Sequence, residues 1–494
     1  MTEKYFKRKG FEFPIVPQNA QGEEILGSLI RALGLVSVSE GKVGKHSREL
    51  HARLGELDDS GVGPISPSRL EKSERLKLFR TILASSIADS KKGVVRMFPL
   101  VPEICRYSAV PSYASSTWNP GGYLMNMLSR SVESVEFDEL IERMSSALNI
   151  NQAEDSQDCD DLWARFVEEE IASWREGGDE EQRPPSLASE FSLKLGGVAS
   201  PDVNFVRHFP LLLDLKRSMT RRKWIAILDS YLRLVMMQDV IWVCQLQQVM
   251  LDMFLVDSDC LEIEWLEERL QPKSMMKEGM RRSLILDSQI GGYPRVSYGL
   301  CYIVEKLEKL GLGFPENATL EEILGYHNGA RDLMSSDQLR SLFKEFNRLI
   351  EEADENWRKR FDGSLSRLKN IREFIEGSTK RQEFVKESKS GFDQGFWFDK
   401  KHRSKHSQFV WSPGPVSVFM MVYLNCRELG VESVSTNEHI EFLATYGMAY
   451  SQKDLAHGAW GQTLRSLGLI VSSPDADGGV MIRTPFLIKE SQVC

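Results

Sequence analysis

Apolar residues recur at three- and four-residue intervals along most of the chain, which is the pattern of amphipathic α-helices. The strongest examples lie within residues 203–256, 297–310 and 337–361. Shorter examples occupy residues 135–148 and 160–175. The chain is therefore predicted to be mainly α, a multi-helix body. Prolines and a Gly-Gly pair interrupt a further segment, so we expect an irregular stretch there, over residues 92–125.

The most apolar stretch, residues 231–256, is long enough to cross a bilayer. Polar and charged residues interrupt it at seven positions, which are Arg233, Gln238, Asp239, Gln245, Gln247, Gln248 and Asp252. Such groups are costly in hydrocarbon. We therefore predict a buried core helix and no membrane partner.

Composition adds bounds on domain number and compartment. The chain has 494 residues, which favours two to four domains, and a net charge of -9. That charge argues against a surface that coats nucleic acid, although a local basic patch is compatible with it. The seven cysteines contain no C-x-x-C pair, and no secretory signal is evident. These features predict a soluble, cytoplasmic protein with reduced thiols.

Breaks in the helical pattern divide the chain into four regions. They are a mostly helical N-terminal region over 1–180, a central helical domain over 187–377, a basic linker over 378–410 and a C-terminal domain over 411–494. The first boundary rests on the Gly-Gly and Pro-Pro pairs within residues 176–186.

The C-terminal domain carries the most specific pattern. Three helices are predicted at residues 416–429, 435–446 and 451–467. They are followed by a strand at 468–471, a Gly-rich turn at 473–479 and a second strand at 480–483. Gly430 is placed to cap the first helix. Three helices followed by a β-hairpin resemble the winged-helix superfamily. The resemblance covers residues 411–487 and no other part of the chain.

The resemblance implies a surface for a macromolecular partner. In winged helices that bind DNA, the third helix enters the major groove and the wing contacts phosphate. The corresponding positions here are Gln452, Lys453, His457, Gln462 and Arg465. However, residues 411–494 have five Lys and Arg against eight Asp and Glu, a net charge of -3. Because duplex affinity depends on phosphate neutralisation, this balance favours protein docking over DNA binding.

Two basic clusters lie outside that domain. One is in the linker next to aromatic residues 396–398, and comprises Lys400, Lys401, Arg403 and Lys405. The other stands at a helix start, and comprises Lys216, Arg217, Arg221, Arg222 and Lys223. Each is a candidate contact for nucleic acid or an acidic partner. The alternative in each case is an ordinary solvated loop or turn.

Catalytic and metal motifs fail on spacing. The segment 41–47 lacks the first glycine and the Ser or Thr of a phosphate-binding loop. Glu387 and Lys389 have the E-x-K form of metal-dependent nucleases, but their flanks do not alternate as a strand should. His402 and His406 have no partner at metal-ligand spacing. We predict no cofactor, no metal and no small-molecule substrate.

These observations favour a non-catalytic adaptor or scaffold subunit that docks protein partners through its winged helix within a larger complex. By fold-level analogy that complex acts on DNA, as in prokaryotic defence or chromosome-organising assemblies. Two alternatives stay open, a direct DNA-binding protein and a divergent nuclease.

Overall fold

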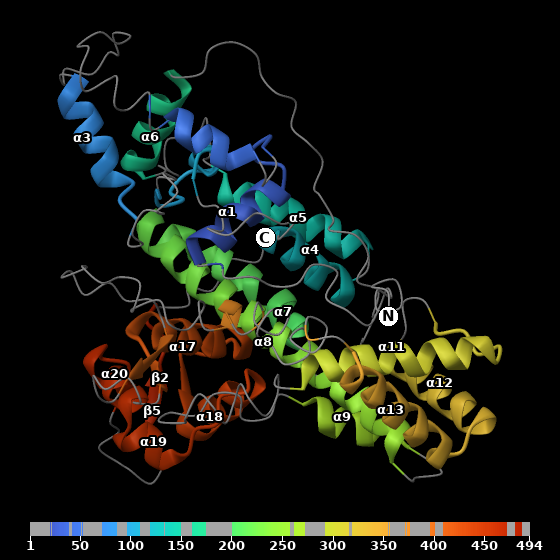
Figure 1. The fold of residues 1–494 in the computed structure, drawn as a ribbon. Coiled ribbons are helices and arrows are strands. Elements are labelled where there is room, and N and C mark those ends of the chain that lie inside the picture. The colour runs from blue at the N-terminus through green and yellow to red at the C-terminus, as the bar shows by residue number, and fades with distance from the viewer. Residues whose placement is uncertain are drawn as a thin grey trace.

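The computed structural model is mainly helical over the residues that it describes (Figure 1). The described residues are 20, 22–38, 42–50, 52, 72–85, 96–108, 119–132, 134–149, 161–173, 200–256, 261–271, 292–315, 319–353, 355, 371, 373–375, 396–400, 409–471 and 480–486.

The central element is the helix α8 (Arg221–Leu255), which spans the body. Helices of the N-terminal region lie around its first half together with the helix of residues 201–214, and the later helices of the central region lie around its end (Figure 1). The first group is α1 (Gly22–Ala32), α3 (Lys72–Ile82), η2 (Pro102–Arg106), α4 (Pro120–Ser131), α5 (Ser134–Leu148) and α6 (Leu162–Ser173). The rest of the body is α7 (Pro201–Asp214), η3 (Leu215–Ser218), α9 (Ile263–Leu270), α11 (Tyr293–Lys309), α12 (Leu320–Leu333) and α13 (Ser336–Glu351).

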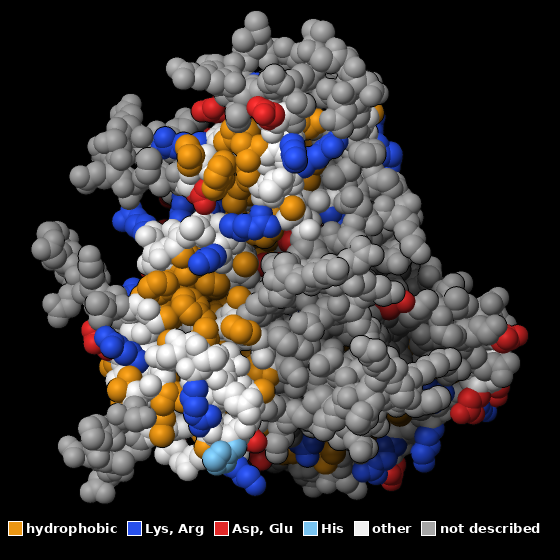
Figure 2. Space-filling view, turned by 90° about the vertical axis from the view of Figure 1, so that its left-hand side faces the viewer, with side chains coloured by type: hydrophobic (Ala, Val, Ile, Leu, Met, Phe, Trp, Pro, Cys, Tyr) orange, Lys and Arg blue, Asp and Glu red, His pale blue; other side chains and the backbone are white. Residues whose placement is uncertain are grey.

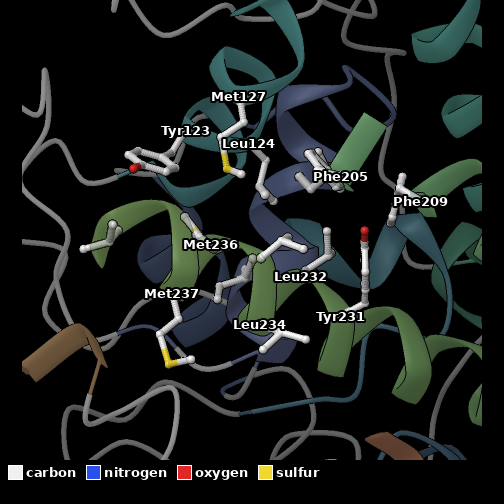
Figure 3. Packing of buried hydrophobic residues seen from close by; sticks show 14 of the residues in the cluster. Tyr123, Leu124, Met127, Phe205, Phe209, Tyr231, Leu232, Leu234, Met236 and Met237 are labelled. Carbon is white, nitrogen blue, oxygen red and sulfur yellow. The ribbon is translucent and has the colours of Figure 1, made fainter. Parts of the chain in front are cut away.

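Helix α8 confirms the prediction of a buried core helix. By its length and composition this helix could cross a membrane, but 89% of its most apolar stretch is buried inside the structure. Figure 3 shows how α4, α7 and α8 share this packing: Tyr123, Leu124 and Met127 of α4 face side chains of α8, with Phe205 and Phe209 of α7 beside them. Close packing of this kind is what an interior helix requires.

Asp239, a buried carboxylate in the middle of α8, is held in internal contacts. Asp239 accepts hydrogen bonds from Tyr123 at 2.5 Å and from Arg130 at 2.7 Å. The Nε atom of Arg130 lies 3.1 Å from Asp202 at the start of α7. Burial raises the pKa of Asp239, and the charge of Arg130 opposes that rise. Because an unpaired buried carboxylate is costly, this network explains how Asp239 is tolerated in the core.

The prediction of an irregular segment over 92–125 is wrong where α4 begins. Pro120 occupies the first turn, a position that proline tolerates, and the Asn119 side chain caps the helix by accepting from the Gly122 amide at 2.8 Å. A Cβ atom on Gly121 would lie 2.2 Å from the carbonyl oxygen of Ser28. The Gly-Gly pair therefore permits close packing of α4 on α1 rather than ending a helix. A second departure is the short 3₁₀ helix η2.

A single cluster of buried apolar side chains extends through α1, α4, α7, α8, α11 and the helix α17 (Pro415–Leu429). The three predicted helical regions thus share one core over the described residues. The predicted boundary at 176–186 lies outside them.

Two of the central helices begin with side-chain caps. Thr319 and Ser335 form capping boxes at the starts of α12 and α13. Helix α13 covers the first part of the predicted 337–361 helix. The rest of that predicted helix lies mostly outside the described residues.

Candidate partner-binding surface

The C-terminal module, residues 409–486, combines four helices with a small sheet. Its elements are β2 (Phe409–Pro413), α17, β3 (Ser433–Ser435), α18 (Thr436–Thr445), α19 (Gln452–His457), α20 (Ala459–Ser466), β4 (Ile470–Val471) and β5 (Met481–Arg483). The three antiparallel strands have the order β3-β5-β4. Strand β3 was not predicted, and the predicted turn at 473–479 lies outside the described residues.

Part of the predicted basic linker is a strand. Residues Phe396–Lys400 form β1, which pairs antiparallel with β2 from Phe396↔Pro413 to Lys400↔Phe409. Aromatic residues favour strands, and that preference outweighs the polar composition of the surrounding segment. Strand β2 in turn lies against α20.

Local signals place the helices of the module. Gly430 adopts the left-handed conformation, with φ of 68°, and ends α17 as expected. Ser435 and Ser451 form capping boxes with Glu438 and Asp454 at the starts of α18 and α19. These side chains satisfy backbone amides that the first helical turn leaves unpaired.

The predicted third helix is broken in two, which corrects its expected extent of 451–467. Helix α19 ends at His457, and α20 begins at Ala459. A Cβ atom on Gly461 would lie 1.8 Å from the carbonyl oxygen of Leu455, so the start of α20 packs directly on the end of α19. The guanidinium of Arg465 donates to the carbonyl oxygen of Ala456 and caps α19.

All five positions that the resemblance assigned to a partner are exposed: Gln452, Lys453, His457, Gln462 and Arg465. They are divided between α19 and α20 rather than aligned on one straight helix. Figure 2 views the side of the molecule on which α20 lies in Figure 1. Over the lower part of that face, the visible Lys and Arg side chains are scattered among apolar and neutral groups.

The opposite side of the module is docked on the body. Helix α17 packs against α7 and α8. The Asn204 side chain donates to the carbonyl oxygen of Thr445 at 2.9 Å, and Gln238 donates to that of Tyr446. Arg207 pairs with Glu428 at 2.8 Å. These contacts fix the module so that α17 faces inward and the α19–α20 surface faces outward.

A buried polar cluster occupies this junction. His208 Nδ1 lies 2.5 Å from the Tyr446 hydroxyl, and its Nε2 lies 3.1 Å from Glu428. The Tyr446 hydroxyl is also 3.3 Å from that of Tyr231. The arrangement resembles a nucleophile-base-acid triad, but Tyr446 is 1% exposed and burial raises its pKa well above the usual value. A substrate therefore has no access to it, and its phenolate is disfavoured.

The basic cluster at the start of α8 is divided between interior and surface. Arg221 is 4% exposed and donates to the carbonyl oxygens of Leu100, Leu148 and Asn149. Arg222 donates to the carbonyl oxygens of Ile82 and Ala84, at 2.5 and 2.7 Å. Its guanidinium also lies 4.3 Å from the centre of the Phe98 ring. These two side chains hold N-terminal segments against α8. Arg221 is buried there rather than on the surface where it was expected, and a partner contact of the half-buried Arg222 stays a prediction.

The other members of the two basic clusters have different placements. Arg217 and Lys223 are exposed, and the half-buried Lys216 donates to the carbonyl oxygen of Asn149 at 3.2 Å. Lys400 ends β1. Lys401, Arg403 and Lys405 lie outside the described residues, as do His402 and His406.

Within the described residues, no three His, Cys, Asp or Glu side chains are grouped closely enough to hold a metal ion. Glu387 and Lys389 of the E-x-K motif are not among those residues. His439, in the core of the module, is wholly buried beside Asn425, and burial lowers its pKa to about 3. It is therefore a neutral packing residue.

Comparison with known proteins identifies no relative: no protein-family model, curated protein or solved structure matches the chain.

Proposed function

We propose that the protein is a non-catalytic adaptor whose helical body holds a C-terminal winged-helix domain in a fixed orientation and presents its α19–α20 surface to a protein partner. The proposal rests on the contrast between the two sides of the module. One side is fixed to α7 and α8 by hydrogen bonds and an ion pair, and the other exposes every position assigned to a partner.

The order of elements supports the winged-helix assignment. The elements follow one another in the order α17, β3, α18, α19, α20, β4 and β5. In the sheet, β5 lies between β3 and β4. The strand β3 adds the short pairing that this topology needs before the second helix. The domain would then correspond to residues 411–487, as the sequence resemblance suggests.

Three features favour a protein partner over duplex DNA. The net charge of residues 411–494 is -3, so phosphate neutralisation is poor. The break between α19 and α20 divides the helix that would enter the major groove. Arg465 donates to the carbonyl oxygen of Ala456, which commits part of its guanidinium to the protein rather than to a phosphate.

The test uses the full chain expressed in its own cells. We expect the variant Lys453→Glu with His457→Glu to lose partners that co-purify with the native chain, because both side chains lie on the exposed face. The matched control is Lys223→Glu, an exposed basic position on the body, which should retain them. Equal partner recovery by all three chains, or recovery of no partner by the native chain, would contradict the proposal.

The direct DNA-binding alternative has one observation in its favour. Pairing of β1 with β2 brings Lys400, at the edge of the basic segment, beside a strand that lies against α20. If this surface binds DNA, duplex affinity should fall steeply with salt, and Lys453→Glu should weaken it at every sequence. No binding of duplex by the full chain at low salt would exclude this alternative.

A place in a DNA-acting complex, such as a defence or chromosome-organising assembly, stays a hypothesis by analogy. The nuclease hypothesis at Glu387 and Lys389 also stays a prediction.

A further inference from the structure

The outward surface of the C-terminal module differs in charge from the module as a whole. Its two helices, α19 and α20, contain Lys453, His457 and Arg465 but a single acid, Asp454. The three basic side chains are exposed, whereas Asp454 is half-buried. Within the part of the chain that the structure describes, none of the three basic side chains forms an ion pair. They are therefore available to an external partner.

The acids of the module are placed differently. Glu428 pairs with an arginine of α7 on the side that faces the body. Glu438 and Asp454 accept from backbone amides at the starts of α18 and α19, at 2.6 and 2.8 Å. Glu432 and Glu441 are exposed, before β3 and on α18, and the other three acids counted in this domain lie outside the described residues. The net charge of -3 thus does not describe the α19–α20 surface.

Lys453, His457 and Arg465 follow one another across this surface, and we call them the basic triplet. Lys453 and His457 are four positions apart, so they lie on the same side of α19. The guanidinium of Arg465 donates to the carbonyl oxygen of Ala456, which places it beside the end of α19. Gln462 donates to the His457 carbonyl oxygen at 3.4 Å and brings its amide to the same place. One extended partner segment can therefore contact all three basic side chains.

Large apolar side chains adjoin the α20 end of the basic triplet. Leu467, directly after α20, is 38% exposed, and Val471 of β4 is 43% exposed. Figure 2 shows basic and apolar side chains next to one another over the lower part of this side. A phosphate backbone offers charge but few apolar groups to cover such residues. A protein segment can supply both carboxylates and apolar side chains, so this mixture favours protein.

We propose that the partner of the α19–α20 surface is an acidic protein segment. Its Asp and Glu side chains pair with the basic triplet, and its apolar side chains cover Leu467 and Val471. The inference rests on the proposed function and narrows the chemistry of the partner. Opposite charges speed association and select the partner, whereas like charges are repelled. Because the whole chain carries a net charge of -9, it repels an acidic segment on average, and the basic triplet determines where that segment binds.

The test measures binding of a labelled, short poly-L-glutamate peptide to the full chain by fluorescence anisotropy. We expect binding at low salt that weakens about ten-fold between about 0.05 M and about 0.3 M NaCl, because salt screens exposed charges. Lys453→Glu with His457→Glu should weaken binding about ten-fold, since attraction is replaced by repulsion. The matched control is Lys223→Glu, an exposed basic position on the body, which should change binding by less than about two-fold.

Arg465→Gln is an independent variant on α20, in case the double variant does not fold. It removes the charge but keeps an amide that can donate to Ala456, and it should weaken binding about three-fold. The inference is overturned if the native chain does not bind the peptide at low salt, or if Lys223→Glu weakens binding as much as the double variant. Tighter binding of duplex DNA of equal total charge also overturns it, because the basic triplet would then serve nucleic acid.

Failure of this inference and failure of the proposed function give different results. If the peptide does not bind but the double variant still loses its co-purifying partners, the α19–α20 surface docks a protein that is not acidic, and the proposed function stands. If the native chain recovers no partner, the proposed function itself is contradicted.

Discussion

Two groups of basic residues, one at the start of α8 and one on the α19–α20 surface, have similar chemistry but opposite placements. In the first, Arg221 is enclosed and donates to three carbonyl oxygens of the N-terminal region. In the second, Lys453 and His457 are exposed. The difference arises from their neighbours: the start of α8 meets carbonyl groups at the ends of other segments, whereas α19 lies on the side of the module away from the body. Basic clusters in a sequence therefore indicate charge but not its use.

Among the variants that test this comparison, Arg221→Ala should lower the free energy of unfolding most. It leaves carbonyl oxygens of Leu100 and Leu148 buried without their donor, so we expect a loss of about 3 kcal/mol in the free energy of unfolding. Lys223→Ala, two residues away and exposed, should change it by less than about 0.5 kcal/mol. Denaturant unfolding measures both. Equal effects would mean that Arg221 is not a structural contact.

Gly461→Ala should have the next largest effect, and it acts on the module. A Cβ atom there meets the carbonyl oxygen of Leu455 at 1.8 Å, so we expect a loss of about 2 kcal/mol as α20 moves away from α19. Gly458→Ala is the control, because its φ of -77° and ψ of 179° suit any residue. Thermal unfolding compares the two, and a tolerated Gly461→Ala would contradict the packing described.

Arg465→Ala should have the smallest effect on stability. The side chain is exposed and provides one hydrogen bond to the Ala456 carbonyl, so its loss should cost about 1 kcal/mol or less. Lys453→Ala should cost nothing measurable, because this side chain is exposed at the first turn of α19. If the two variants unfold alike, Arg465 has the same solvated role as Lys453.

Local signals in the sequence predicted much of the fold. Gly430 marked the end of α17, and the pattern over 435–446 marked α18, because these effects depend on residues close in sequence. The length and apolar character of α8 likewise predicted its burial.

Features set by distant contacts could not be predicted in this way. The pair Gly121-Gly122 suggested a break in regular structure. Gly121 lies within a helix instead, because the backbone of α1 at Ser28 packs too closely against it for a side chain. The break at Gly458 and the strand β3 likewise depend on packing within the folded module. The exposed positions of the candidate surface followed from the winged-helix resemblance. His208 was missed because its partners, Glu428 and Tyr446, lie more than 200 positions away in the chain.

The unbroken course of α8 has a mechanical consequence. Its 35 residues form a strut about 50 Å long at the usual rise of an α-helix. Helix α17 rests on it, and so do α11 and α13 toward its other end (Figure 1). A force applied at α19 or α20 is thus transmitted through one continuous helix and not taken up by bending at a break in it. Two molecules held by opposite ends of the protein would be kept at a set spacing and angle.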